Sequence, residues 1–199
     1  MINYRPVMKH HQKVIANYKP CLRAFPKQLF SIVLSNAKKN TKAVCTTVNQ
    51  RNELVNSLKC FTKDTYPELV QLGHHVTSLV EYLANMTNID RMIPGMCCGY
   101  YILLTDAKVK IDQLCSQQGV GQAGSEYFLG MIKSAVSDAV DMMCGSFSTI
   151  EQCTKKMPDL IQEIMTVKEE TKDTKYNYTM VLPFLKVIER IDTETNINN

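Results

Sequence analysis

The chain contains few of the residues that interrupt a helix, with only 8 glycines and 7 prolines among its 199 residues. No segment shows the alternation of apolar and polar side chains that marks a half-buried strand. No run approaches the roughly 18 consecutive apolar residues that would predict a transmembrane helix. These absences argue against a β-rich fold and against a membrane span.

Apolar side chains recur instead at three- and four-residue steps, which is the period of an amphipathic helix. The stripes predict helices over residues 27–48, 50–62, 94–117 and 183–192, and others that begin at Pro67, Ser125 and Pro158. The stripe from Phe128 to Met143 is the most regular, so we expect that helix to be central and buried. Ser148 and Glu151 fit a capping box for a short helix that carries Cys153.

The length of the chain suits one compact domain. We therefore predict an all-α fold, a single helical domain over residues 1–199 built as a disulfide-linked bundle of six or seven helices. Residues 1–20 are weakly periodic and are expected to fray, and the polar tail 193–199 is expected to be disordered. The polar run KEETKDTK, residues 168–175, predicts an exposed turn.

Eight cysteines are present, an even number that fits four disulfides in an oxidising compartment. They are Cys21, Cys45, Cys60, Cys97, Cys98, Cys115, Cys144 and Cys153. Vicinal Cys97 and Cys98 cannot easily bond to each other and diverge by about 100° on a helix, so each is expected to join this segment to a different element. The pairing stays open, because eight cysteines allow more than a hundred combinations. The competing interpretation is a cytosolic protein with reduced, buried thiols.

Asn85 and Asn177 begin the tripeptides NMT and NYT, which are acceptors for N-glycosylation and favour secretion. The first 19 residues, MINYRPVMKHHQKVIANYK, include basic residues but lack the apolar segment of a signal peptide. Three explanations stay open: numbering that begins after processing, a truncated chain, or a protein that is not secreted. We predict a secreted, extracellular glycoprotein.

The patterns of catalytic and metal-binding sites are missing from the sequence. It contains no CxxC pair and no His-x3-His spacing, and the pairs His10-His11 and His74-His75 diverge on a helix. It also contains no G-x-S-x-G elbow and no arrangement that suggests a catalytic triad. We predict a protein that is not an enzyme, with no metal and no cofactor.

The sequence GVGQAG at residues 119–124 matches the G-x-G-x-x-G pattern of dinucleotide-binding loops. Such a loop must follow a strand that delivers the pyrophosphate to a helix N-terminus. Here the preceding residues end a predicted helix. The motif therefore predicts an interhelical turn.

Three resemblances involve the cysteines. The stretch CCGYY, residues 97–101, resembles the CCxxH motif of secreted phospholipase A2, but Tyr101 stands at the place of that family's catalytic histidine, and no glycine-rich calcium loop precedes it. The step Cys144-x8-Cys153 resembles the last cysteine pair of insect odorant-binding proteins, which are helical carriers of small apolar ligands. With eleven methionines, this resemblance implies the alternative function of carrying a small hydrophobic ligand or lipid in a bundle cavity of about 300 Å³ or more.

The third resemblance covers a little over half the chain. The order Cys45, Cys60, Cys97-Cys98, Cys115, Cys144 and Cys153 resembles small secreted cysteine-rich helical proteins of arthropods, most of which have no assigned function. Those proteins commonly have a further cysteine about nine residues after the vicinal pair, where this chain has Ala107. The resemblance implies an extracellular, all-helical, disulfide-stabilised protein.

Charge is distributed unevenly along the sequence. Residues 1–63 contain 12 basic residues and one acidic residue, and residues 64–199 contain 11 basic and 18 acidic residues. The two parts are expected to attract each other, either as complementary solvated faces of one fold or with the first part forming a face that binds polyanions.

A basic stripe on the predicted second helix is the candidate for such a face. Arg23, Lys27, Lys38 and Lys42 lie near one line, and Lys39 lies beside it. An anionic surface or sulfated glycan suits this spacing, whereas nucleic acid does not, because no aromatic residues are interleaved to stack bases. We predict a non-catalytic extracellular binding or interaction protein, and the sequence leaves its ligand and oligomeric state open.

Overall fold

The computed structural model of the chain describes residue 20, residues 23–171 and residues 181–197. These parts contain eight α-helices, short 3-10 helices and no strand. The α-helices are α2 (Ala24–Thr46), α3 (Val48–Ser57), α4 (Tyr66–Asn85), α5 (Met92–Gln117), α6 (Gln122–Cys144), α7 (Ile150–Lys156), α8 (Pro158–Glu170) and α9 (Val181–Ile197), and the 3-10 helices η2 (Leu58–Cys60) and η3 (Ile89–Arg91) lie between them. The predicted all-α, disulfide-linked bundle is confirmed.

The described α-helices number one more than the six or seven expected for the bundle, and α7 and α8 are separate elements, as the patterns around Cys153 and Pro158 predicted. Met157 lies between them with φ −142° and ψ 62°, outside the helical region. A residue that precedes a proline is restricted in this way, and Pro158 then begins α8.

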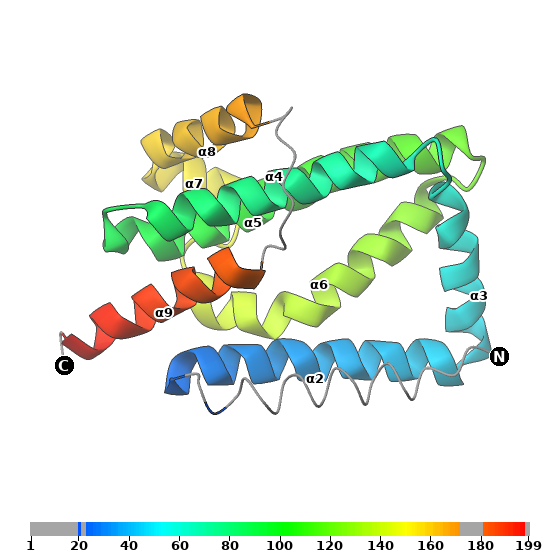
Figure 1. The fold of residues 1–199 in the computed structure, drawn as a ribbon. Coiled ribbons are helices and arrows are strands. Elements are labelled where there is room, and N and C mark those ends of the chain that lie inside the picture. Colours follow the sequence, from blue (N-terminus) through cyan, green and yellow to red (C-terminus); the bar gives the residue numbers. More distant parts are fainter. Residues whose placement is uncertain (1–19, 21–22, 172–180, 198–199) are drawn as a thin grey trace.

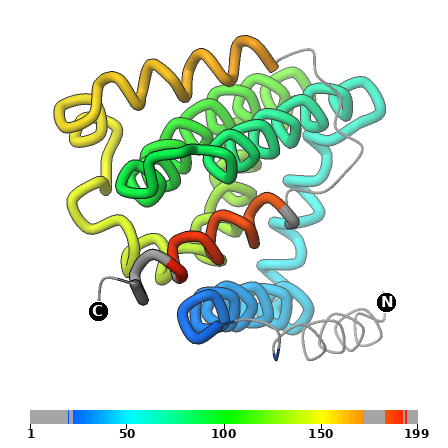
Figure 2. The backbone as a smooth tube through the Cα atoms, turned by 60° about the vertical axis from the view of Figure 1, so that its left-hand side comes forward, coloured from blue at the N-terminus to red at the C-terminus, as the bar shows by residue number. Residues whose placement is uncertain are grey.

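The long helices α4 and α5 lie side by side and antiparallel, with α7 and α8 on one side of the pair and α9 on the other (Figure 1). Helix α6 runs obliquely from the far end of α5 to α2, and α3 connects α2 back to the α4 and α5 pair (Figures 1 and 2). The segment from α2 to α3 therefore packs on the rest of the bundle mainly through α6 and α9.

Helix α5 is the central element. Eleven of its residues are buried, among them Met92 and Ile111 with no exposed surface. The prediction that α6 is the central, buried helix is wrong, since Ile132 in its apolar stripe is 38% exposed. The reason is that α5 contacts α4, α6, α7 and α8, whereas α6 packs against α2, α3 and α5.

The main hydrophobic core lies where α4, α5, α7, α8 and α9 meet. Leu83, Met92 and Leu160 are nearly or fully buried there. Each such side chain contributes about 1.5–3 kcal/mol to the free energy of unfolding by leaving water. A smaller cluster joins η2, α5 and α6 around Cys60, and a third joins α2, α6 and α9 around Leu29.

The GVGQAG segment is the interhelical turn that the sequence predicted. Gly119 and Gly121 both have φ +70°, in the left-handed region that favours glycine, and they connect α5 to α6. Gly124 is needed for a close approach: a Cβ there would lie 2.7 Å from a methyl carbon of Val120 and 3.0 Å from the sulfur of Cys60. The last glycine of the motif thus allows α6 to pack closely against the Cys60–Cys115 disulfide.

Three local predictions need correction. The N-cap of α7 is Thr149 and not Ser148, and its hydroxyl accepts a hydrogen bond from the backbone N–H of Gln152. Helix α9 continues to Ile197, so the expected disordered tail over residues 193–199 is wrong for residues 193–197. Adding residues to a helix that already exists costs much less than starting one, so a polar segment can extend α9.

The third correction concerns residues 168–175, expected as an exposed turn. Helix α8 extends to Glu170, and Lys168 is half-buried within it. Residues 172–175 lie outside the described residues, as do residues 1–19, on which most of the predicted N-terminal fraying falls.

Six of the cysteines form three disulfides. The pairs are Cys60–Cys115, Cys97–Cys144 and Cys98–Cys153. Vicinal Cys97 and Cys98 therefore fasten α5 to the end of α6 and to α7, two different elements as predicted. Cys45, near the end of α2, is a free thiol among the described residues, where the other cysteines are bonded to one another, so its predicted disulfide is not found there. Cys21 lies outside the described residues.

Candidate functional site

Helix α2 presents one face to the bundle and the opposite face to solvent. On the inner face Leu29 is 3% exposed and packs with Ala139 of α6 and Ile188 of α9. The helix contains no acidic residue. Because Leu29 packs against α6 and α9, the apolar side of α2 faces inward and its lysines lie on the outside.

Two asparagines add polar contacts between α2 and α6. Asn36 is buried, and its Nδ2 donates to Oδ2 of Asp138 over 2.9 Å. One turn later, Asn40 Nδ2 donates to Ser134 Oγ over 2.7 Å. A buried amide must keep its hydrogen bonds, so these contacts fix the register of α2 on α6.

The predicted anion-binding residues lie together along the outer side of α2. Lys27, Lys38, Lys39 and Lys42 are all exposed, and with Arg23 at the start of the helix they form what we call the basic face. Arg23 also donates through Nη1 to Oγ1 of Thr193 in α9 over 3.2 Å. Arg23 thus contributes its charge from a position that is tied to α9.

Large exposed apolar side chains occur elsewhere on the described surface. They are Val48, Val55, Leu58, Tyr66, Val70, Val109, Ile132, Met142 and Met165. None of these belongs to α2. The basic face is therefore polar and charged, without apolar side chains that could enter a bilayer.

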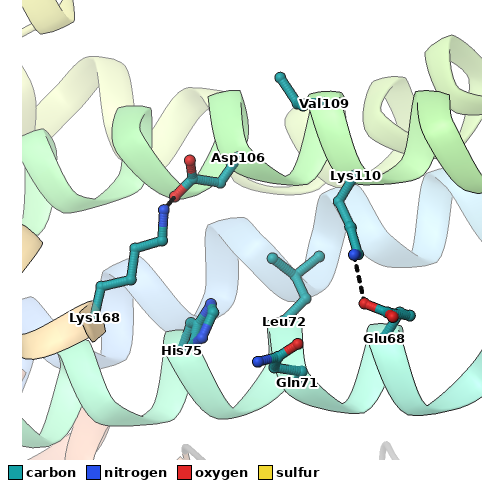
Figure 3. Close-up of a pocket in the computed structure, with 8 residues that line it drawn as sticks. All are labelled: Glu68, Gln71, Leu72, His75, Asp106, Val109, Lys110 and Lys168. Atoms are coloured by element: carbon teal, nitrogen blue, oxygen red, sulfur yellow. Dashed lines mark hydrogen bonds and ion pairs between the residues drawn. The ribbon is translucent and has the colours of Figure 1, made fainter. Parts of the chain in front are cut away.

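A groove of about 250 Å³ lies between α4 and α5 and is bordered by α8 (Figure 3). Its lining consists of Glu68, Gln71, Leu72 and His75 from α4, Asp106, Val109 and Lys110 from α5, and Lys168 from α8. The α4 residues recur at three- and four-residue steps and so share one side of that helix. The groove is open to solvent and mixes apolar and charged groups.

Two ion pairs mark the ends of this groove. Lys110 Nζ lies 2.5 Å from Oε2 of Glu68, and Lys168 Nζ lies 2.6 Å from Oδ2 of Asp106. Figure 3 shows Leu72 between the two pairs and His75 near the second. The charged groups of the groove thus neutralise one another in pairs.

His75 has an unsatisfied buried nitrogen. Its Nε2 has no hydrogen-bond partner among the described groups. Burial lowers the pKa of His75 below its usual 6.5, and the charge of Lys168 lowers it further, whereas Asp106 and Glu169 act in the opposite direction. The imidazole is therefore neutral at neutral pH.

A second hollow, of about 240 Å³, lies between α2, α3 and α6. Asn40 and Tyr127 line it, together with Gln50, whose Oε1 is buried without a partner among the described groups. The Tyr127 hydroxyl donates to the backbone oxygen of Gln50 over 2.9 Å. Neither hollow is the enclosed apolar cavity that a lipid carrier requires, so neither supports the alternative function.

Of the two predicted glycosylation sites, the structure describes Asn85 but not Asn177. Asn85 is exposed at the C-terminal end of α4, where its Oδ1 accepts a hydrogen bond from Lys186 Nζ over 2.8 Å and its Nδ2 donates to the Glu81 backbone oxygen. Asn177 lies outside the described residues. Glycosylation at both stays a prediction.

The expected attraction between the two parts of the chain does not appear in the described ion pairs. The four pairs are Arg91–Glu163, Lys108–Asp112, Lys110–Glu68 and Lys168–Asp106. Both partners of each lie within residues 64–199, the acidic part. The described contacts of α2 with α6 and α9 are instead apolar contacts and hydrogen bonds.

Within the described ranges, no helix has the length and apolar character needed to cross a membrane. In the same ranges, no three histidine, cysteine or acidic side chains converge as metal ligands would. The class defined by these features is an all-α bundle cross-linked by three disulfides. Comparison with protein-family models, with curated proteins and with solved structures finds no match to this chain.

The groove was not predicted from the sequence. Its members are far apart in the chain, and Lys168 was expected in an exposed turn. The spacing of Glu68, Leu72 and His75 on one side of α4 was the one signal available, and it does not indicate which helix lies opposite.

Proposed function

We propose that this protein is a secreted, disulfide-stabilised, non-catalytic binding protein whose basic face engages an extended polyanion, such as a sulfated glycan. The observation that carries the proposal is the row of exposed lysines on an acid-free helix whose inner side is fixed against α6 and α9. Three buried disulfides support an oxidising, extracellular setting.

The shape of the basic face favours a linear ligand. Arg23 and Lys42 are 19 positions apart on one helix, which corresponds to about 28 Å at 1.5 Å per residue. Lys27 and Lys38 lie near one line between them, and Lys39 lies beside it. A polymer with regularly spaced sulfates can follow such a line, whereas a single phosphate would meet only one or two of its lysines.

A membrane surface fits the basic face less well. Helices that bind in the plane of a bilayer combine basic residues with exposed apolar side chains that enter the lipid. The exposed large apolar residues of the described surface lie outside α2. Attraction to anionic lipid would therefore depend on charge alone.

Heparin affinity chromatography with a salt gradient tests the proposal. The wild-type protein is expected to be retained and to elute as rising salt screens its charges. Replacing Lys38, Lys39 and Lys42 by alanine should weaken binding about tenfold, because three exposed contacts of about 0.5 kcal/mol each are lost.

A matched variant separates the basic face from net charge. Lys63 in the turn before α4, Lys133 of α6 and Lys155 of α7 are exposed lysines outside α2, and their replacement by alanine removes the same total charge. This control should elute close to the wild type. Equal loss of retention in both variants would mean that net charge, and not the face, controls binding. Tight binding to phosphatidylserine vesicles without heparin retention would replace the glycan by a membrane surface.

A further inference from the structure

The two halves of α8 are anchored differently. In the first half, Leu160 and Ile164 are buried in the main core, and Glu163 accepts hydrogen bonds from Tyr82 and Arg91. In the last part, residues 165–171, no residue is buried. There Lys168 Nζ of α8 lies 2.6 Å from Oδ2 of Asp106 in α5 (Figure 3).

The charged side chains that line the groove are paired with one another. Lys110 and Glu68 form the other pair, so the lysines and carboxylates that line the groove are already bound to one another. The polar atom left without a described partner is Nε2 of His75. An added proton on this imidazole would change the charge beside the Lys168–Asp106 pair.

We propose that His75, Lys168 and Asp106 form a pH-dependent clasp, in which protonation of His75 transfers Asp106 from Lys168 to His75 and releases the end of α8. With His75 neutral, Lys168 is the cation that Asp106 binds, and the clasp is closed. With His75 protonated, two cations compete for one carboxylate and repel each other. The released lysine can extend into water, which is inexpensive for a side chain already partly exposed.

The charged groups that face His75 come from three helices. Lys168 and Glu169 approach from α8, Asp106 from α5, and His74 is its neighbour on α4. Because burial and Lys168 keep the pKa of His75 below 6.5, the folded protein binds this proton less readily than the unfolded chain. The closed clasp is therefore fully formed above about pH 6.5 and opens as the pH falls below that value.

Opening of the clasp would have a local consequence. The last turns of α8 would lose their attachment to α5, while the first half of α8 would stay in the core. The wall of the groove formed by Lys168 would move away, and Leu72 would become more accessible. The clasp therefore makes access to this groove sensitive to acid.

Hydrogen–deuterium exchange of the full chain tests this, with exchange rates corrected for the intrinsic effect of pH. Between about pH 7.5 and about pH 5, protection of residues 165–171 should fall roughly three- to tenfold, while peptides from α5 should stay protected. The variant His75→Gln, which cannot take up the proton, should abolish this loss. His74→Gln, a change at the adjacent position, should retain it.

Two lysine variants test the same proposal independently, in case His75→Gln is poorly folded. Lys168→Met should raise exchange of residues 165–171 at both pH values and remove the pH dependence. Lys110→Met breaks the pair at the other end of the groove and should leave the pH dependence intact. Unchanged protection in the wild type at acid pH, or a full acid response in Lys168→Met, would overturn the clasp.

Discussion

The α2–α3 arm (residues 24–57) and the cross-linked region (residues 58–156) are held in the molecule by different means. All three described disulfides lie within the cross-linked region. The arm contains the free thiol of Cys45, and α2 is attached through a small apolar cluster around Leu29 and through the hydrogen bond of Asn36. In α3, Val48 and Val55 are more than half exposed.

This difference shows that covalent stabilisation and the candidate binding surface are in separate parts of the fold. The cross-linked region contributes most of the main core around α5, to which α8 and α9 add the rest, whereas the arm displays the basic face. Regions with fewer buried contacts open at lower free energy than the core. The arm is therefore expected to open before the cross-linked region does.

Removal of a disulfide should give the largest effect. Cys98 and Cys153 are 55 residues apart, and the loop-entropy model assigns such a bridge about 4 kcal/mol of stability. Replacing both by alanine should lower the free energy of unfolding, measured with urea, by about 3–5 kcal/mol. Replacing Cys45 by alanine should change it by about 0.5 kcal/mol or less. Equal effects would remove the distinction between the two regions.

A change at the contact between arm and bundle should have an intermediate effect. Asn36→Ala leaves the carboxylate of Asp138 without its 2.9 Å hydrogen bond and should cost about 1–2 kcal/mol. Exchange in α2 should increase more than in α5, because the lost contact holds the arm. Asn40→Ala, at a less buried position, is the matched variant and should cost less. A uniform rise in exchange across the molecule would show that the arm does not open separately.

Protonation of Glu163 at acid pH should have the smallest effect of the three on the free energy of unfolding. The pKa of Glu163 is lowered first by the hydrogen bond from Tyr82 and then by Arg91, so this carboxyl stabilises the fold above its unfolded pKa near 4.5, and that contribution is lost as the pH falls through the lower folded value. The side chain is 39% exposed, so the contribution is small.

Glu163→Gln should therefore flatten the decline of unfolding free energy between about pH 5 and about pH 3. Glu170→Gln, at an exposed position of the same helix, serves as the control and should leave the decline unchanged. The Glu163 interpretation fails if both variants behave like the wild type.

Local patterns in the sequence predicted the helices well. The starts of α4 and α8 lie at or next to Pro67 and Pro158, because proline fits the first turn of a helix and little else within one. The divergence of Cys97 and Cys98 likewise follows from the angle between neighbours on a helix. These features depend on residues within one or two turns, so the sequence is sufficient to predict them.

The basic face was also predictable, because the spacing of Lys27, Lys38 and Lys42 places them on one side of a helix wherever that helix lies. Their exposure depended on the apolar stripe of the same helix, which had to face inward. The free thiol of Cys45 was not predictable, since an even count of cysteines does not say which pairs come within bonding distance.

The sequence alone determined that this chain forms amphipathic helices, that its vicinal cysteines point to different neighbours, and that one helix presents a row of cations. Tertiary structure alone decided that α5 and not α6 is central, which cysteines pair, and that His75, Asp106 and Lys168 meet beside one groove. The physical reason is the range of the forces involved. Helical periodicity is set by neighbours along the chain, whereas burial and charge pairing depend on how helices pack across the molecule.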